Sequence, residues 1–324
     1  MTDFTFITAN DIHISDTNPR SRTDNFKETI LGKISQMRTA CDKLGADAAL
    51  IAGDLFNLKN PSKNSHRLNQ DLIREFKKFP CPIYMIEGNH DLTANNLDSL
   101  LEQPLGVLFE DKTVIQLRET IIEKDGHKIS LVGIPYTENI DISKIKMPKK
   151  GDCKVQICLM HIYASLKSGT LFKEKIYGYD ELSLLSPDIF VIGHYHIDQG
   201  IYDLKGKKFI NIGSMSRGTL SEEDITHIPQ IGFIKINIDD DKVSYNARTI
   251  KLKIKPANEI FDLEKREEEK KESAEILAFV EKLAVEATQS SIQENRNIED
   301  IINTLDLAKT VKDKVLYLIH EAST

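Results

Sequence analysis

Short motifs along the chain bring together aspartate, asparagine and histidine, the residue types that bind divalent metal ions. In chain order they are Asp11-Ile12-His13, Gly53-Asp54, Gly88-Asn89-His90-Asp91, His161 and Gly193-His194-Tyr195-His196. Five of the nine histidines fall within them, which is more than chance scatter accounts for. Carboxylates, imidazoles and one amide carbonyl form the mixed oxygen and nitrogen set that suits Mn, Fe or Zn better than Ca.

The residue types and spacing favour a pair of ions and phosphoester hydrolysis. Asp54 stands alone on its predicted loop, and a lone carboxylate between two metal ions can bridge them. Two ions about 3.5–4 Å apart can hold the attacking and leaving oxygens of an in-line displacement at phosphorus. Glycines at positions 53, 88 and 193 relax the backbone and permit close approach at the motifs.

Each motif follows the carboxyl end of a predicted strand. The strands are the short apolar runs Phe4–Thr8, Ala48–Ala52, Ile83–Ile86, Val155–Met160 and Ile189–Ile192. In open α/β sheets ligands bind at the edge where the strands end. We therefore expect the motifs to converge at one edge.

Helical patterns lie between these strands. Asn25–Leu44 carries apolar residues at helical spacing and ends at Gly45, and a second helix is expected around Leu68–Phe76, starting at Ser62 or Asn64. The alternation of strand and helix predicts a largely parallel sheet. Further strand-like runs, which widen this sheet or form a second one, are Ile129–Ile134, Lys208–Ile212, Gly232–Ile238 and Val243–Thr249.

The last quarter of the chain has a different character. The run Glu264–Glu272 mixes both charges, as a solvated helix face does. The apolar stripe Ile276–Ala287 fits either its own core or a partner, and Ile298–Ala322 is expected to form two short helices. We expect a catalytic domain over 1–250, a linker and helical extension over 251–297, and a C-terminal helix pair over 298–324.

The five motifs together resemble the calcineurin-like metallophosphoesterase family, whose pattern is D-x-H, G-D, G-N-H-D, H and G-H-x-H. No residue of that pattern is missing between Asp11 and His196. The resemblance implies an α/β fold, a four-layer sandwich of mixed sheets flanked by helices, here with a C-terminal helical extension. It also implies two divalent ions, expected to be Mn, with Fe or Zn as alternatives.

The resemblance implies a role for each motif residue. The first ion would be held by Asp11, His13, Asp54 and His196, and the second by Asp54, Asn89, His161 and His194. His90 would donate a proton to the leaving oxygen, and Asp91 would orient the His90 ring.

Finer features are similar to the SbcD-type DNA repair nucleases. They are Gly53-Asp54-Leu55-Phe56-Asn57 followed by Pro61-Ser62, the stretch Pro82–Asp91, Gln199, and Asn211-Ile212-Gly213-Ser214 with Arg217 beyond it. This resemblance implies a Mn-dependent DNA exonuclease and endonuclease subunit of repair and recombination. The residues after Pro256 are fewer than in a full DNA-capping domain, so the extension would be a reduced cap. The helix pair over 298–324 would bind an SbcC-type coiled-coil ATPase.

Candidate substrate contacts follow the first and last motifs. Arg20 and Arg22 come shortly after His13 and could contact phosphates, although pairing with Asp24 is an equal alternative. By the SbcD resemblance, Ser214 and Arg217 are further candidates. The net charge of −7 excludes the basic footprint of a simple nucleic-acid-binding domain. Metal ions, local basic loops or a partner must therefore attract DNA.

The sequence predicts a cytoplasmic protein of a bacterium or a phage-infected host, without membrane contact. No apolar run approaches the roughly 20 residues needed to cross a bilayer, and Met1-Thr2-Asp3-Phe4 lacks the features of a signal peptide. The four cysteines form no C-x-x-C pair, which argues against a zinc ribbon. The sequence leaves open whether two copies pair through helices such as Asn64–Lys78.

Two other functions fit the same motifs. A stand-alone phosphodiesterase or phosphatase for a small nucleotide, lipid or phosphoprotein would have the same metal-binding core. A non-catalytic scaffold built on the fold is a weaker alternative, because it has no use for converging ligands and a proton donor.

Overall fold

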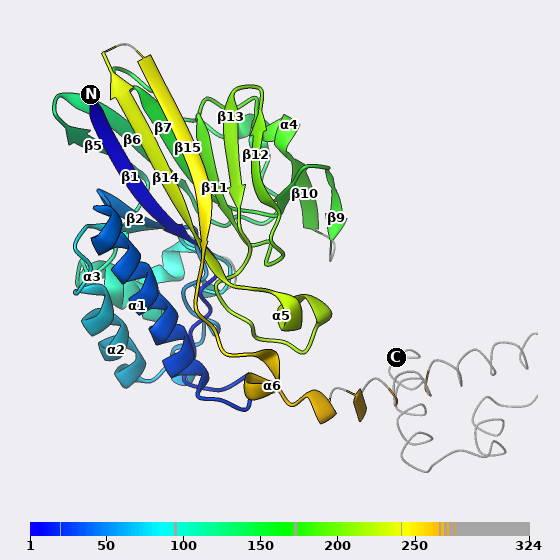
Figure 1. Ribbon diagram of the computed structural model, residues 1–324. Coiled ribbons are helices and arrows are strands. Elements are labelled where there is room, and N and C mark those ends of the chain that lie inside the picture. The colour runs from blue at the N-terminus through cyan, green and yellow to red at the C-terminus, as the bar shows by residue number, and fades with distance from the viewer. Residues whose placement is uncertain are drawn as a thin grey trace, which may run out of the picture. The chain divides into compact units, whose positions relative to one another are not determined.

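Two six-stranded sheets lie face to face in the part of the chain that the computed structural model describes (Figure 1). The described residues are 1–265 without 20, 94, 95, 172, 173 and 241, together with 267, 268, 271 and 276. The chain divides into the units Met1–Phe261 and Asp262–Thr324, and the fold below is that of the first. The predicted helix pair over 298–324 lies outside the described residues, as does most of the predicted extension.

The first sheet has the order β15-β14-β1-β2-β3-β4. Its strands are β1 (Thr2–Ala9), β2 (Ala48–Ile51), β3 (Ile83–Met85), β4 (Ile115–Gln116), β14 (Gln230–Asp239) and β15 (Lys242–Lys251). The first four run parallel, and β14 and β15 form an antiparallel hairpin beside β1. This hairpin is one of the expected additions that widen the sheet.

The second sheet has the order β12-β13-β11-β7-β6-β5. Its strands are β5 (Glu119–Lys124), β6 (His127–Ile134), β7 (Val155–His161), β11 (Ile189–Gly193), β12 (Gly200–Leu204) and β13 (Lys207–Asn211). A small sheet of order β8-β10-β9 lies apart from it and consists of β8 (Ala164–Ser165), β9 (Gly169–Leu171) and β10 (Glu174–Gly178). The expectation that β7 and β11 continue the first sheet was wrong.

Strict alternation of side chains builds the layers around the first sheet. In β1, Phe4 and Phe6 point into the core between the sheets, whereas Ile7 and Ala9 point to the helices. Leu50 of β2 joins the first of these cores. Such strands are apolar on both faces because each face is covered.

Helices cover the outer face of the first sheet. Figure 1 shows α1 (Phe26–Leu44), α2 (His66–Phe76) and α3 (Pro104–Glu110) gathered on that side. The Asn25 side chain caps α1 by accepting from the Glu28 amide, and Gly45 ends the helix in the left-handed region, so this helix was predicted correctly. The predicted start of α2 was wrong, because Ser65 is its cap and a 3₁₀ turn occupies Pro61–Lys63.

Shorter elements complete the fold. They are α4 (Tyr179–Leu182), α5 (Glu222–Thr226), α6 (Ala257–Ile260) and the 3₁₀ turns Leu97–Glu102 and Ile142–Lys144. On the outer face of the second sheet, the Phe209 ring stacks between Tyr179 and Phe190, with ring centroids 4.7 and 4.9 Å away. The layers are thus helices, sheet, sheet, and a thinner cover of α4 and loops, which confirms the predicted mixed sheets flanked by helices.

Candidate metal centre

The loops after β1, β2, β3, β7 and β11 carry the predicted motifs and meet at one edge of the two sheets. Backbone bonds tie the first two loops together, since the Asp11 amide donates to the Gly53 carbonyl at 3.3 Å and the His13 amide to the Asp54 carbonyl at 3.0 Å. The five motifs therefore converge as the strand ends predicted.

Several predicted ligands have positive φ angles, a backbone conformation that residues other than glycine rarely adopt. The φ angles of Asp11, His13, Asp54 and His194 are 49°, 49°, 53° and 87°. Each such residue costs on the order of 1–3 kcal/mol, and the cost persists only where surrounding contacts fix the conformation. Backbone strain thus accumulates at the residues that face the centre.

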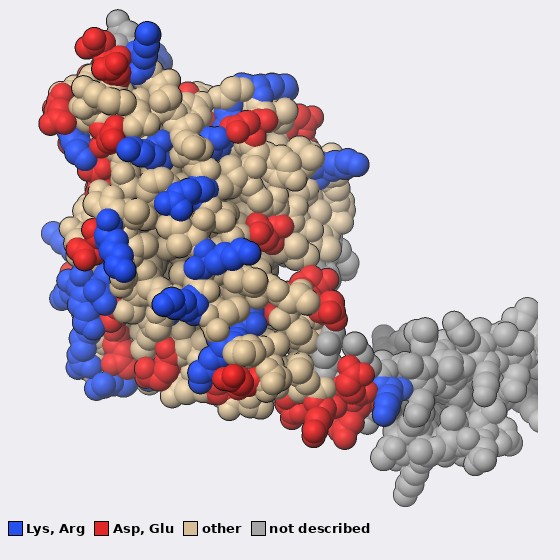
Figure 2. All heavy atoms as spheres, in the orientation of Figure 1, with Lys and Arg blue, Asp and Glu red and all other residues tan. Residues whose placement is uncertain are grey.

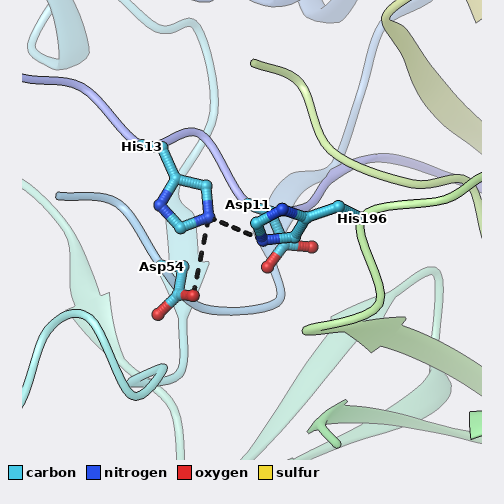
Figure 3. A group of neighbouring side chains, drawn as sticks. All are labelled: Asp11, His13, Asp54 and His196. Atoms are coloured by element: carbon cyan, nitrogen blue, oxygen red, sulfur yellow. Dashed lines mark hydrogen bonds and ion pairs between the residues drawn. The ribbon is translucent and has the colours of Figure 1, made fainter. Parts of the chain in front are cut away.

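The first cluster contains Asp11, His13, Asp54 and His196 (Figure 3). One ligand atom from each lies within 4.8 Å of all the others. His13 Nε2 is 2.9 Å from His196 Nε2 and 3.6 Å from Asp54 Oδ2. His196 is exposed and the other three are buried, so this cluster opens to solvent on the His196 side.

The second cluster contains Asp54, His161 and His194, all buried. His161 Nε2 is 3.3 Å from Asp54 Oδ2 and 3.2 Å from Asn89 Oδ1. Asp54 belongs to both clusters, as a bridging carboxylate must. The structure thus brings all seven predicted ligands together, and their binding of metal stays a prediction.

The chemistry of this donor set fits cations. Asp54 Oδ2 is buried and accepts no well-aligned hydrogen bond within the described residues. Burial raises the pKa of Asp54, but His161 and His13 outweigh that effect and hold it well below its ordinary value. A buried carboxylate oxygen without a donor is costly, and a bound cation would offset that cost.

The histidines differ in charge. Burial, together with the neighbouring His161, lowers the pKa of His194 to about 2, and burial also holds the pKa of His13 well below its ordinary value. Burial lowers the pKa of His161 as well, but the Asp54 carboxylate outweighs burial and raises it to about 9. His13 and His194 are therefore neutral at pH 7, the form that binds metal, whereas His161 must lose a proton to do so.

The structure corrects the predicted role of Asp91. Its carboxylate accepts the backbone amides of Leu55, Phe56 and Gly88, so it ties the second motif to the third and does not orient the His90 ring. The His90 ring is held instead by the Asn57 carbonyl, which accepts from Nδ1 at 2.8 Å. Asp91 is acceptor-only when ionised, and three backbone donors around it satisfy that role.

The structure shows the alternative pairing of Arg22 with Asp24 and corrects the predicted substrate contact of Arg217. Arg22 donates twice to Asp24, at 2.7 and 2.8 Å, and a third time to the Arg217 carbonyl at 2.6 Å. Arg217 donates to the Lys255 carbonyl, and both guanidinium groups lie against the Phe261 ring. Both arginines are buried, so they anchor the chain near residues 255–261 and do not face a substrate.

Ser214 is buried beside the centre, so the structure does not support its predicted contact with substrate. Its hydroxyl donates to the Asp11 carbonyl at 2.7 Å, which helps to hold the Asp11 backbone. Arg20, the remaining candidate, lies outside the described residues.

Three residues at the centre had no signal in the sequence. Glu174 Oε2 is 3.2 Å from His194 Nε2, and the Tyr136 hydroxyl donates to the same oxygen at 3.3 Å. The Tyr163 ring lies over His194, with centroids 3.9 Å apart. Glu174 belongs to β10, a short strand without a motif, so only the folded chain places it here.

Comparison with known proteins gives one family and several distant relatives. The sequence profile described as Calcineurin-like phosphoesterase matches residues 4–209. The DNA double-strand break repair protein Mre11 of Archaeoglobus fulgidus is 23% identical over 194 residues, which are 55% of this chain and 42% of that protein. The protein of the same name from Sulfurisphaera tokodaii is 25% identical over 287 residues, 78% of this chain and 69% of that one.

A third relative is the uncharacterized metallophosphoesterase YhaO of Bacillus subtilis. It is 24% identical over 207 residues, which are 60% of this chain and 49% of YhaO. The chain thus spans less than half the length of two of these relatives. Among the described residues, the search for a helix long and apolar enough to span a membrane found none.

Proposed function

The chain belongs to the calcineurin-like phosphoesterase family, and from that premise we propose that it is a Mn-dependent DNA exonuclease and endonuclease subunit of the SbcD type. The observation that carries the proposal is the pair of clusters that share Asp54. The similarity to two proteins named Mre11 supports DNA as the substrate.

The two ions would be held by two sets of residues that share Asp54. Asp11, His13, Asp54 and His196 would hold the first, and Asp54, Asn89, His161 and His194 the second. When bound, the ions would supply the Lewis acidity that activates water and neutralises charge at the phosphate. The backbone amide of His90 donates to the Asp54 carboxylate, and that of His194 donates to the Asp11 carboxylate. These hydrogen bonds fix the orientation of both carboxylates without a bound ion.

His90 would donate a proton to the leaving oxygen. Its Nδ1–H is held by the Asn57 carbonyl, and its ring lies edge-on to His13 with centroids 4.8 Å apart. The other ring nitrogen, Nε2, is then free for proton transfer when the ring is an imidazolium. The half-buried position of His90 keeps it within reach of a substrate.

A partner ATPase would provide much of the DNA-binding surface. The net charge of −7 opposes DNA binding by the chain alone. Figure 2 shows Lys and Arg side chains spread singly over the middle of the face that carries β14 and β15, with acidic side chains around them. The proposed docking segment is 298–324, and its deletion should abolish co-purification with the ATPase while hydrolysis of a small diester continues.

The proposal is tested by hydrolysis of linear double-stranded DNA with Mn, with and without the co-expressed ATPase. Bis-p-nitrophenyl phosphate and a phosphomonoester serve as parallel substrates. Mn-dependent degradation of DNA, lost in His90→Ala, is the expected result. Turnover of the small esters with DNA left intact, even beside the ATPase, would favour a stand-alone phosphodiesterase or phosphatase.

A further inference from the structure

Glu174 provides a carboxylate beside the second cluster that no motif supplies. Its Oε2 is 3.2 Å from His194 Nε2. Tyr136, which is buried, donates its hydroxyl to the same oxygen at 3.3 Å and so restricts the carboxylate. Glu174 comes from β10 of the small sheet, whereas His194 follows β11 of the second large sheet.

Two other rings of the centre, those of His161 and His90, share one arrangement. His161 donates its Nδ1–H to the Ala52 carbonyl at 2.7 Å, while its Nε2 faces Asp54 and Asn89. His90 likewise donates its Nδ1–H to a carbonyl. In these two rings a carbonyl outside the clusters accepts the Nδ1–H, so Nε2 is the nitrogen left for metal binding or proton transfer.

His194 fits the same arrangement with Glu174 as the outside acceptor. Within the described residues, Glu174 belongs to neither ligand cluster, although it touches His194. With Nε2 of His194 engaged by Glu174, Nδ1 is the nitrogen left for the centre. The Tyr163 ring over His194 restricts rotation of the imidazole further.

We propose that Glu174 is the positioning residue of His194. It accepts the Nε2–H, fixes that tautomer and presents Nδ1 to the second ion. A carboxylate on the outer nitrogen also makes the inner nitrogen a better donor, and losing such a partner typically weakens metal binding about 10–100-fold. The inference rests on the proposed two-ion centre but does not depend on DNA being the substrate.

Counting Mn bound by the full chain over a titration of free Mn tests the role. Glu174→Ala should lower the affinity for one of two ions by roughly 10–100-fold and leave the other unchanged. Glu174→Gln keeps an acceptor oxygen for the ring N–H, so its loss should be smaller. Glu138→Gln is the matched control, because Glu138 is exposed and adds charge near Glu174 without touching His194.

Nitrogen NMR of labelled imidazoles in the Mn-free protein gives a readout that is independent of catalysis. His194 should be protonated on Nε2 in the natural chain and should lose that preference in Glu174→Ala, while thermal unfolding shows that both proteins fold. Binding of both ions by Glu174→Ala at natural affinity would overturn the proposal. So would an equal loss in Glu138→Gln, or a His194 ring protonated on Nδ1. A chain that binds two Mn ions as expected but leaves DNA intact even beside the ATPase would refute the nuclease proposal alone.

Discussion

At the scale of single residues, the backbone and the side chain of one residue make different contacts at the centre. His90 shows this division, because its backbone amide donates to Asp54 Oδ1 at 2.8 Å whereas its ring is held by Asn57. A substitution of the side chain therefore leaves the Asp54 contact in place. Proton donation and metal binding can then be separated by mutation.

We predict that His90→Ala binds two Mn ions but loses about 10²–10⁴-fold in kcat, the usual contribution of general acid catalysis. Metal content and turnover of a small diester would be measured on the same sample. His66→Ala, an exposed histidine outside the motifs, is the matched control and should keep full activity. Loss of metal from His90→Ala would contradict the proton-donor role.

The charge of His161 predicts how Mn affinity depends on pH. Asp54 outweighs burial and raises the pKa of His161 to about 9, so the ring is protonated at neutral pH and must release its proton when metal binds. Affinity should rise with pH by up to roughly tenfold per unit and level off near the His161 pKa, as for a single displaced proton. Calorimetry in buffers of different ionisation enthalpy measures the released proton, and an affinity that is flat between neutral pH and the His161 pKa would exclude this assignment.

At the scale of elements, glycines let the ends of strands from different sheets come together. A Cβ on Gly193, at the end of β11, would lie 2.1 Å from the Ala52 carbonyl oxygen after β2 and 3.0 Å from His161 Nδ1. That carbonyl is the acceptor that fixes the His161 ring. Packing between the sheets and the orientation of the His161 ring therefore both depend on Gly193.

We predict that Gly193→Ala lowers both the melting temperature and the affinity for Mn, because the two strand ends must move apart. Gly32→Ala, on α1 with open space around it, is the control and should stabilise the protein by roughly 0.5–1 kcal/mol. Thermal unfolding and Mn titration of both variants measure the effects. Unchanged Mn affinity in Gly193→Ala would show that the close approach of Gly193 to Ala52 and His161 is not needed for metal binding.

The sequence predicted those elements whose signals are local. The cap residue Asn25 and the terminal Gly45 define α1, and apolar runs locate the strands before each motif. Convergence of the motifs followed because all of them come after strand ends. The assignment of β7 to a second sheet could not be predicted, since β7 is buried on both faces like β2 of the first sheet and has the same apolar pattern.

Side-chain direction was the part of the centre that residue type and spacing could not predict. Arg22 and Arg217 follow the motifs as substrate contacts would, yet they turn inward to Asp24 and Phe261. Asp91 neighbours His90 in the chain but binds backbone amides. Glu174 reaches the centre from a distant strand, and only tertiary structure brings it to His194.

At the scale of the whole molecule, the acidic charge bears on the proposed function. The net charge of −7 opposes DNA binding, whereas the proposed substrate is DNA. A basic partner would reconcile the two, and it would also make DNA cleavage by the complex sensitive to salt. Within the described residues, every ligand of the candidate metal centre lies in the unit Met1–Phe261.

The number of Mn ions bound per chain in the natural protein and in Asp54→Asn tests this account most directly. Asp54 is the residue common to both clusters, so its replacement should impair both ions together. The account predicts two ions for the natural chain, measured by elemental analysis after gel filtration in Mn, and neither retained by Asp54→Asn. A natural chain that binds a single ion, or an Asp54→Asn variant that keeps two at natural affinity, would contradict a centre in which two ions share one carboxylate.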